Sequence, residues 1–150
     1  MRYLNFAIFA MIFAVPGFAQ TSGTTKNAPL ITANPVRSTP AYAEVLLRRT
    51  EVEADLESLL VEYTEDYPKV KQERFELGLI VKESDRLLAI KSSDMPRLTS
   101  ALGKLIVRKV ELQSDLWSLQ QQFGEAHPEV KRAKRKVEIF ERAIIEILGN

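Results

Sequence analysis

The sequence predicts an all-α protein built from two tandem antiparallel helical hairpins. From Ala41 onward, apolar residues recur at the three- and four-residue spacing of a helix stripe, and no stretch alternates with the two-residue period of a strand. Residues 48–88 and 108–148 align without a gap at an offset of 60 residues, which indicates a duplicated unit. A proline interrupts the helical pattern at the same place in each copy, at Pro68 and at Pro128.

Composition limits the chemistry open to this chain. With 150 residues, 45% of them hydrophobic and 27% charged, the sequence is typical of a chain that folds around a core. The 21 Lys and Arg residues nearly balance the 20 Asp and Glu residues, so no strong overall field attracts nucleic acid or an anionic membrane. Because the chain has no cysteine and one histidine, His127, we expect no disulfide, no metal site and no cofactor.

Residues 1–19 have the pattern of a signal peptide. Arg2 precedes an apolar run, Pro16 ends any helix, and small residues at Gly17 and Ala19 favour cleavage after Ala19. An uncleaved anchor is the alternative, but the apolar run is shorter than the roughly 20 residues that span a bilayer. We therefore expect an exported protein, periplasmic or secreted, whose mature form starts at Gln20 and does not span the membrane.

Residues 20–40 are predicted to be a disordered linker. They carry Thr, Ser, Asn and Gly, contain three prolines and show no helical period. Such a segment buries too little apolar surface to offset the entropy of ordering it. We expect it to act as a spacer or tether.

The first hairpin is predicted over residues 41–91 and the second over residues 92–150. Ser92-Ser93-Asp94 offers a cap for the start of the second hairpin. The predicted core stripe runs through Val45, Val52, Leu56, Leu59, Tyr63, Val70, Leu77, Ile80 and Leu87 in the first copy, and through Leu105, Leu112, Leu116, Leu119, Phe123, Val130, Ala133, Val137, Phe140, Ile144 and Ile147 in the second. The spacing leaves open whether the four helices close as one bundle or form two separate arms.

The turn of each hairpin is predicted at its proline. Gly124 is the residue type preferred just past a helix end, and Pro68 and Pro128 suit the first turn of the helix that follows. The residue before a proline is driven out of the α region, which places Tyr67 and His127 in the turns. Because Tyr67 occupies the position equivalent to His127, we expect the site to take an aromatic ring in a turn rather than a general base.

The turn sequences resemble a known family. Leu56, Leu59, Tyr63, Tyr67-Pro68 and Val70, with their counterparts Leu116, Leu119, Phe123, His127-Pro128 and Val130, are similar to the coiled-coil hairpin segment of bacterial polysaccharide chain-length determinant (co-polymerase) and exopolysaccharide transport proteins. In that family, an aromatic residue, three further residues and His-Pro-x-Val join long periplasmic helices. The resemblance covers about 25 residues of each copy. It implies a periplasmic helical hairpin and carries over no activity.

Other polar residues predict no catalytic centre. Ser58 and Ser118 recur in the two copies, but each falls in mid-helix without a base at helical spacing or a glycine-rich turn. Glu51 with Asp55, repeated sixty residues later, places two carboxylates one helical turn apart. That pair could bind a divalent cation, but without an oxygen-rich loop a solvated helix face is the favoured interpretation. We expect the protein not to be an enzyme.

One charge cluster is a candidate binding surface. Five cations open the last helix, where the helix dipole favours acids: Lys131, Arg132, Lys134, Arg135 and Lys136. Residues 41–91 carry 8 basic and 12 acidic side chains, and residues 92–150 carry 10 and 8, so the two copies have opposite net charge. This favours pairing with a protein partner, including a second copy. An anionic glycan is the alternative, whereas export argues against nucleic acid.

Two function classes follow from these observations. The first is a structural or adaptor protein of the cell envelope that associates with itself or with an envelope complex, with exopolysaccharide export as the pathway that the resemblance implies. The second is a small periplasmic chaperone or stress protein that holds clients on an apolar helical surface. The two classes differ in the expected exposure of the apolar residues that widen the stripe, because a fixed assembly would bury them and a chaperone would leave them open to clients. These residues are Leu79, Val81, Leu88, Ile139, Ile145 and Leu148.

Overall fold

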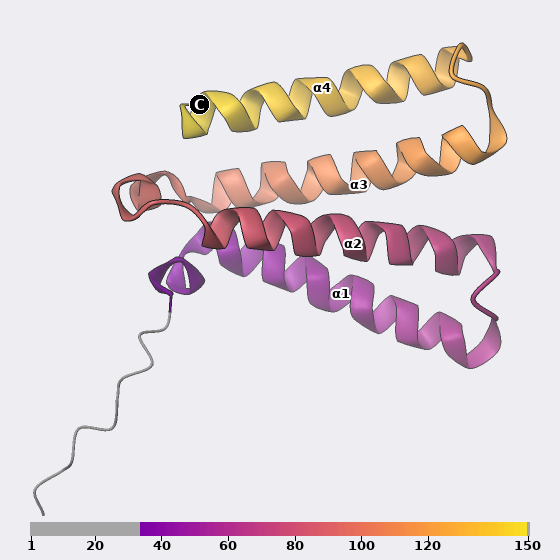
Figure 1. Ribbon diagram of the computed structural model, residues 1–150, viewed down its shortest axis with the longest axis horizontal. Helices are drawn as coiled ribbons and strands as arrows, with labels where there is room; N and C mark the ends of the chain where they lie inside the picture. Colours follow the sequence, from indigo (N-terminus) through magenta and orange to yellow (C-terminus); the bar gives the residue numbers. More distant parts are fainter. Residues whose placement is uncertain (1–33, 150) are drawn as a thin grey trace, which may run out of the picture. The chain divides into compact units, whose positions relative to one another are not determined.

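The computed structural model describes residues 34–149, and this part of the chain is helical without strands. It contains four α-helices and two short 3-10 helices (Figure 1). In chain order these are η1 (Pro35–Ser38), α1 (Pro40–Glu62), α2 (Pro68–Leu88), η2 (Ser92–Arg97), α3 (Ser100–Gln122) and α4 (Pro128–Leu148). The predicted all-α class is therefore confirmed. The predicted signal peptide and residues 20–33 of the predicted linker lie outside the described residues.

The last part of the predicted linker is ordered. Val36 in η1 is 2% exposed and belongs to the main hydrophobic core. The Asn34 side chain holds this segment in place, because it accepts a hydrogen bond from Val36 N (3.0 Å) and donates one to Leu88 O at the end of α2 (2.9 Å). Thr39 then caps α1 through a hydrogen bond from Tyr42 N. The prediction was wrong for residues 34–40, since one buried valine and two caps order a segment whose composition is that of a linker.

The short connections α1–α2 and α3–α4 each lead into a helix that begins with proline. α1 ends at Glu62 and α2 begins at Pro68, while α3 ends at Gln122 and α4 begins at Pro128. Both prolines occupy the first helical turn, where the missing N–H removes no hydrogen bond. Figure 1 shows α2 lying beside α1 and α4 beside α3, and both pairs are in contact.

The start of α3 differs from the prediction. Residues Ser92–Arg97 form η2, which contains Pro96, and do not cap the long helix. α3 instead begins at Ser100, with Thr99 as its N-cap; Thr99 Oγ1 accepts a hydrogen bond from Leu102 N (3.3 Å). Pro96 lacks the N–H that a continued helix needs, so the α-helix starts only after it.

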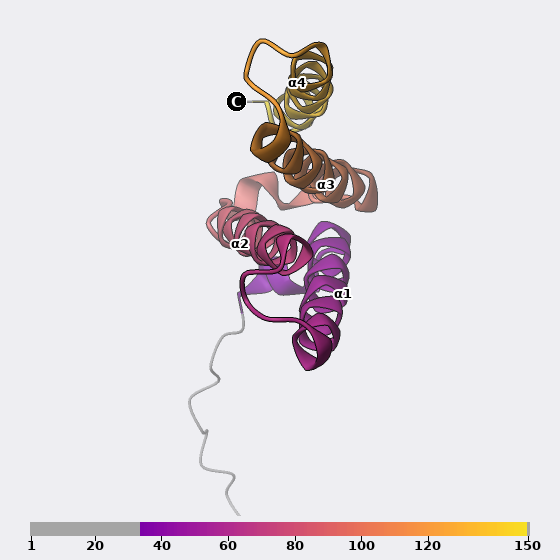
Figure 2. The ribbon, with the colours of Figure 1, turned by 90° about the vertical axis from the view of Figure 1, so that its right-hand side faces the viewer.

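Figure 2 shows how the helices pack. α1 and α2 contact each other and both contact α3, whereas α4 packs mainly against α3. The main core lies between these helices and η1: Val36, Ala41, Tyr42, Val45, Ile80, Leu87, Leu98, Leu102, Ile106, Val110 and Ile144.

The predicted stripe is buried or half-buried along most of its length and exposed where α1 and α3 reach their connecting turns. Val52 and Leu56 are buried, as are Val70, Leu112, Val130 and Val137, but Leu59, Leu116 and Leu119 are half-buried. Tyr63 and Phe123 are 41% and 39% exposed. Placing these two aromatic residues in the core was wrong, because each follows the last residue of its helix and turns its ring toward the connecting turn.

A glycine allows α1 and α3 to approach closely. A Cβ atom added at Gly103 would lie 2.9 Å from the Cα and from the carbonyl oxygen of Ala41, and 2.8 Å from Cβ of Glu44. Any larger residue would push the two backbones apart. Gly78 in α2 has open space around its Cα.

Candidate functional site

The basic residues predicted at the start of α4 are at the surface. Lys131, Arg132, Arg135 and Lys136 are exposed, and the Lys134 side chain is 41% exposed. Three of the five form local ion pairs, Arg132 with Glu129 (2.8 Å), Lys134 with Glu125, and Arg135 with Glu138 (3.5 Å). These exposed pairs contribute little to stability, and all five cations remain accessible to a partner.

The same helix exposes large apolar side chains. Ile139 is 49% exposed and Ile145 is 46% exposed. The stripe residues Leu79, Val81, Leu88 and Leu148 are half-buried. Ile139 therefore lies near the cations of the first turns of α4, whereas Ile145, farther along the helix, lines a hollow with Leu87 of α2 and Ile106 of α3.

The outer side of α1 has a different character. Leu46, Leu47 and Val61 are 45%, 57% and 85% exposed. They lie among exposed carboxylates, which are Glu51, Asp55, Glu57 and Glu62. α1 thus exposes an apolar and acidic surface, and α4 an apolar and basic one.

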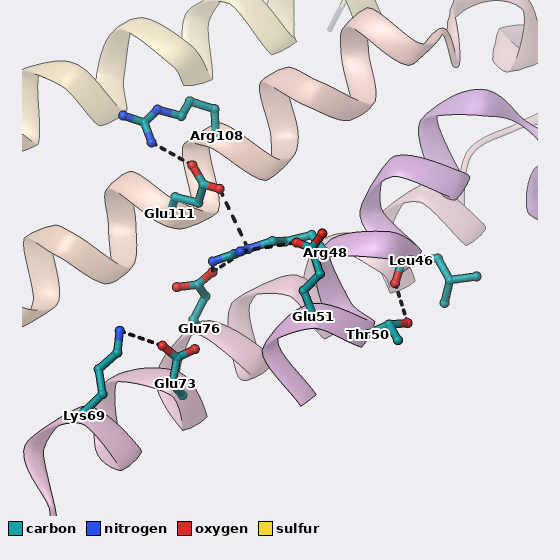
Figure 3. Close-up of polar contacts among 9 residues, drawn as sticks. All are labelled: Leu46, Arg48, Thr50, Glu51, Lys69, Glu73, Glu76, Arg108 and Glu111. Carbon is teal, nitrogen blue, oxygen red and sulfur yellow. Dashed lines mark hydrogen bonds and ion pairs between the residues drawn. The ribbon is translucent and has the colours of Figure 1, made fainter. Parts of the chain in front are cut away.

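Arg48 joins α1, α2 and α3 through a set of ion pairs (Figure 3). Its Nε lies 2.9 Å from Oε1 of Glu76 in α2 and 3.8 Å from Oε1 of Glu111 in α3. Glu51 approaches Arg48 from the next turn of α1 at 3.4 Å, and Arg108 binds Glu111 at 2.7 Å. Of the predicted carboxylate pairs, Glu51 and Glu111 therefore serve ion pairs, while Asp55 and Asp115 are exposed.

The surroundings of Arg48 keep it charged. Burial by itself would lower its pKa, but the hydrogen bond and the negative charge of Glu76, with a further contribution from Glu111, raise the pKa above the ordinary value. The Glu76 side chain is 6% exposed and its carboxylate meets a guanidinium at short range. A carboxylate so nearly buried needs such a partner.

Two further glutamates of α2 are buried. Glu83 lies 2.9 Å from Lys109 Nζ in α3 and 2.7 Å from Arg86. Glu73 is 4% exposed and pairs with Lys69 through Oε1 (2.7 Å), while its Oε2 accepts no hydrogen bond from the described residues. None of these buried carboxylates was predicted from the sequence. A signal for their burial was present in the sequence: the glutamates share one face of the predicted helix with two apolar residues. In order, that face is Glu73, Glu76, Ile80, Glu83 and Leu87.

Both turns stack an aromatic pair. The rings of Tyr63 and Tyr67 lie 4.1 Å apart, and those of Phe123 and His127 lie 4.3 Å apart, nearly parallel in each case. His127 Nδ1 also accepts a hydrogen bond from Glu129 N (3.3 Å), which caps α4. Tyr67 precedes Pro68 in the same way without a side-chain cap. Gly124 lies in the second connection with open space around it.

One surface hollow, of about 470 Å³, lies beside the half-buried Trp117 and is lined by Asp66, Pro68, Lys71, Trp117, Ser118, Gln121 and Gln122. Within residues 34–149, no group of three or more His, Asp or Glu side chains could hold a metal ion. Ser58 is exposed and Ser118 is half-buried, both within helices. No helix in the described residues has the length and apolar character needed to cross a membrane.

Comparisons with family models, with curated proteins and with solved structures each gave no match.

Proposed function

We propose that the protein is a non-enzymatic assembly module of the bacterial cell envelope, exported and built from two copies of one helical hairpin. α1 and α3 each have 23 residues, and α2 and α4 each have 21. The helices of the second pair begin and end sixty residues after those of the first. The matching aromatic stacks in the two connections support the same duplication.

The observation that carries the proposal is that α1 and α4 each expose apolar side chains among charged ones. α1 exposes Leu46, Leu47 and Val61 among acids, and α4 exposes Ile139 close to five cations. Apolar side chains surrounded by charges are typical of surfaces that bind another protein, because the apolar atoms provide affinity and the charges select the partner. A helical scaffold with two such surfaces is suited to joining components.

The envelope location and the link to exopolysaccharide export rest on the sequence. The first 19 residues have the pattern of a signal peptide, and the turns resemble those of periplasmic co-polymerase hairpins. If export occurs as proposed, the protein recovered from the envelope fraction has a mass that begins at Gln20. A mass that retains residues 1–19 would contradict cleavage and favour an anchored form.

Site-specific crosslinking in living cells tests the assembly role. A photoreactive residue at Ile139, on the exposed side of α4, is expected to give discrete adducts with envelope proteins or with a second copy. The same residue at Asp115, which is also exposed but lies outside the apolar and charged surfaces, is the matched control and should give none. Equal yields at both positions, or no adduct at either, would count against an assembly module.

A chaperone role is the second candidate, favoured by the neighbouring exposed side chains of Leu46 and Leu47. A holdase would suppress the aggregation of a heat-unfolded model client at near-equal molar amounts, and replacing both leucines with serine would remove that effect. An assembly module would leave the client's aggregation unchanged.

A further inference from the structure

The side of α3 that faces the first hairpin is buried, but the equivalent side of α1 is not. Gly103 meets α1 at Ala41, and Ser114 accepts a hydrogen bond from Gln72 of α2. Four buried positions of α3 have exposed counterparts sixty residues earlier. These are Gly103, Ile106, Val110 and Ser114, with counterparts Ala43, Leu46, Thr50 and Ala54. We call Ala43, Leu46, Thr50, Ala54 and the adjoining Glu51 and Glu57 the α1 outer face.

The converse holds for the side of the first hairpin that receives α3. Phe75 stacks on Trp117 of α3, with ring centroids 5.1 Å apart, and Arg48 and Glu76 are covered. The residues sixty positions later are exposed. We call this second surface the α4 basic face, and it consists of Arg108, Arg132, Arg135, Lys136 and Ile139.

From these two surfaces we infer that copies of this chain associate head to tail, with the α1 outer face of one copy on the α4 basic face of the next. The inference rests on the proposed function and names its partner as a second copy. The new contact would resemble the arrangement that already exists between α3 and the first hairpin, with a wider helix spacing where Ala43 takes the place of Gly103. Because two different surfaces meet, the association is heterologous. A pair of copies leaves one α1 outer face and one α4 basic face free, so the association continues to a ring or a filament.

Charge complementarity identifies the occupant. In the new contact, each residue of α3 is replaced by the residue sixty positions earlier in the next copy, and each residue of the first hairpin by the residue sixty positions later. The Trp117–Phe75 contact thereby becomes a contact between Glu57 and Arg135. Shifting the contact between Glu111 and Arg48 brings Glu51 opposite Arg108. Both new pairs join opposite charges. The Lys109–Glu83 contact becomes a contact between Arg49 and Ala143, so it brings no like charges together.

Apolar atoms occupy the same interface. Leu46 is 45% exposed on one surface and Ile139 is 49% exposed on the other. Their burial would stabilise the contact, and the charges around them would direct it. Because these charges are exposed, the association is expected to weaken as salt is raised.

An anionic glycan is the competing occupant of the α4 basic face, and it makes a different prediction. A glycan would need the cations of α4 alone. A second copy needs the acidic residues of α1 as well, so the effect of changing Glu57 separates the two.

Sedimentation velocity of the purified protein over a range of concentrations tests the inference. The parent protein should associate. Glu57→Arg and Arg135→Glu should each lower the association constant by at least about tenfold, since each places like charges opposite each other. An equimolar mixture of the two variants should associate again, because each copy then meets an opposite charge on both of its surfaces.

The duplication provides matched controls. Asp115→Arg in α3 and Lys71→Glu in α2 make the same changes in charge at residues outside both surfaces, and Asp115, Lys71 and their counterparts Asp55 and Lys131 are all exposed. These variants should associate like the parent.

Three results would overturn the inference: a parent that stays monomeric at every concentration, controls that weaken association as much as the test variants, or a mixture that fails to restore it. Monomeric parent protein that binds an anionic polysaccharide through Arg135 would assign the basic face to a glycan instead. Crosslinks from Ile139 to envelope proteins would still support the assembly role in that case, so failure of this inference is distinguishable from failure of the proposed function.

Discussion

Lys109 Nζ in α3 lies 2.9 Å from Glu83 Oε1 in α2, and the two side chains are only 4% and 10% exposed. This ion pair fixes one helix of the second pair against one helix of the first. Together with Arg48, Glu76 and Glu111, it makes the contact of α3 with α1 and α2 polar as well as apolar. A buried pair of this kind adds little net stability compared with apolar residues, but it penalises any arrangement that separates its partners.

Breaking this pair from one side should be costly. Glu83→Leu leaves the Lys109 ammonium buried without its partner, and we expect a loss of about 3 to 5 kcal/mol in the free energy of unfolding. The double variant Glu83→Leu with Lys109→Met should lose much less, because no charge then remains buried. Urea denaturation measures both. Equal losses in the single and double variants would show that the charge is not what the pair contributes.

Two glycines within helices should respond in opposite ways to alanine. Alanine is favoured over glycine in a helix by about 1 kcal/mol, so Gly78→Ala, in open space, should stabilise the protein by up to that amount. Gly103→Ala should destabilise it despite the same gain, since the new Cβ would lie 2.9 Å from the Ala41 backbone. Thermal unfolding followed by circular dichroism compares the two. Stabilisation of both variants would mean that α1 and α3 do not approach closely.

Core and surface leucines should separate clearly. Leu102 is fully buried, and Leu102→Ala should lower the free energy of unfolding by about 2 to 5 kcal/mol, through lost burial and the cavity left behind. Leu47 is 57% exposed, and Leu47→Ala should cost no more than about 0.5 kcal/mol. Denaturation at high salt, where association is suppressed, gives both values. Similar losses would place α1 in a different rotation about its axis.

The ion pair in the first connection should shift one titration. A hydrogen bond from Arg74 holds the pKa of Glu65 below its ordinary value of 4.5, and correspondingly raises that of Arg74. A carboxylate with a lowered pKa in the folded state stabilises it above pH 4.5, and this contribution is lost as the pH falls through the lowered value.

Carboxyl NMR of Glu65 measures this effect directly. Arg74→Gln should return the titration midpoint toward the ordinary value, while Lys82→Gln, remote from the turn, should leave it unchanged. A midpoint that is already ordinary in the parent protein would refute the pair in solution.

The helices and their ends could be predicted from the sequence because they depend on local interactions. Proline sets the first turn of the helix that it begins, as Pro68 and Pro128 do, and the three- and four-residue spacing of apolar side chains identifies the buried side. The exposure of the cations on α4 followed from the same reasoning, since five charges in one short run cannot all be buried.

Tertiary packing decided which residues are buried within those helices. Glu76 and Glu83 look like solvated residues in the sequence, but α3 lies against them and supplies a partner for Glu83, while Arg48 of α1 supplies one for Glu76. Val36 lies in a segment with the composition of a linker, yet a core position was available to it. Tyr63 and Phe123 continue the apolar stripe in the sequence but stack in the turns. Helical period and capping are read within a few residues, whereas the burial of a charge depends on what lies opposite it, and for Lys109 and Glu83 that partner is 26 residues away in the chain.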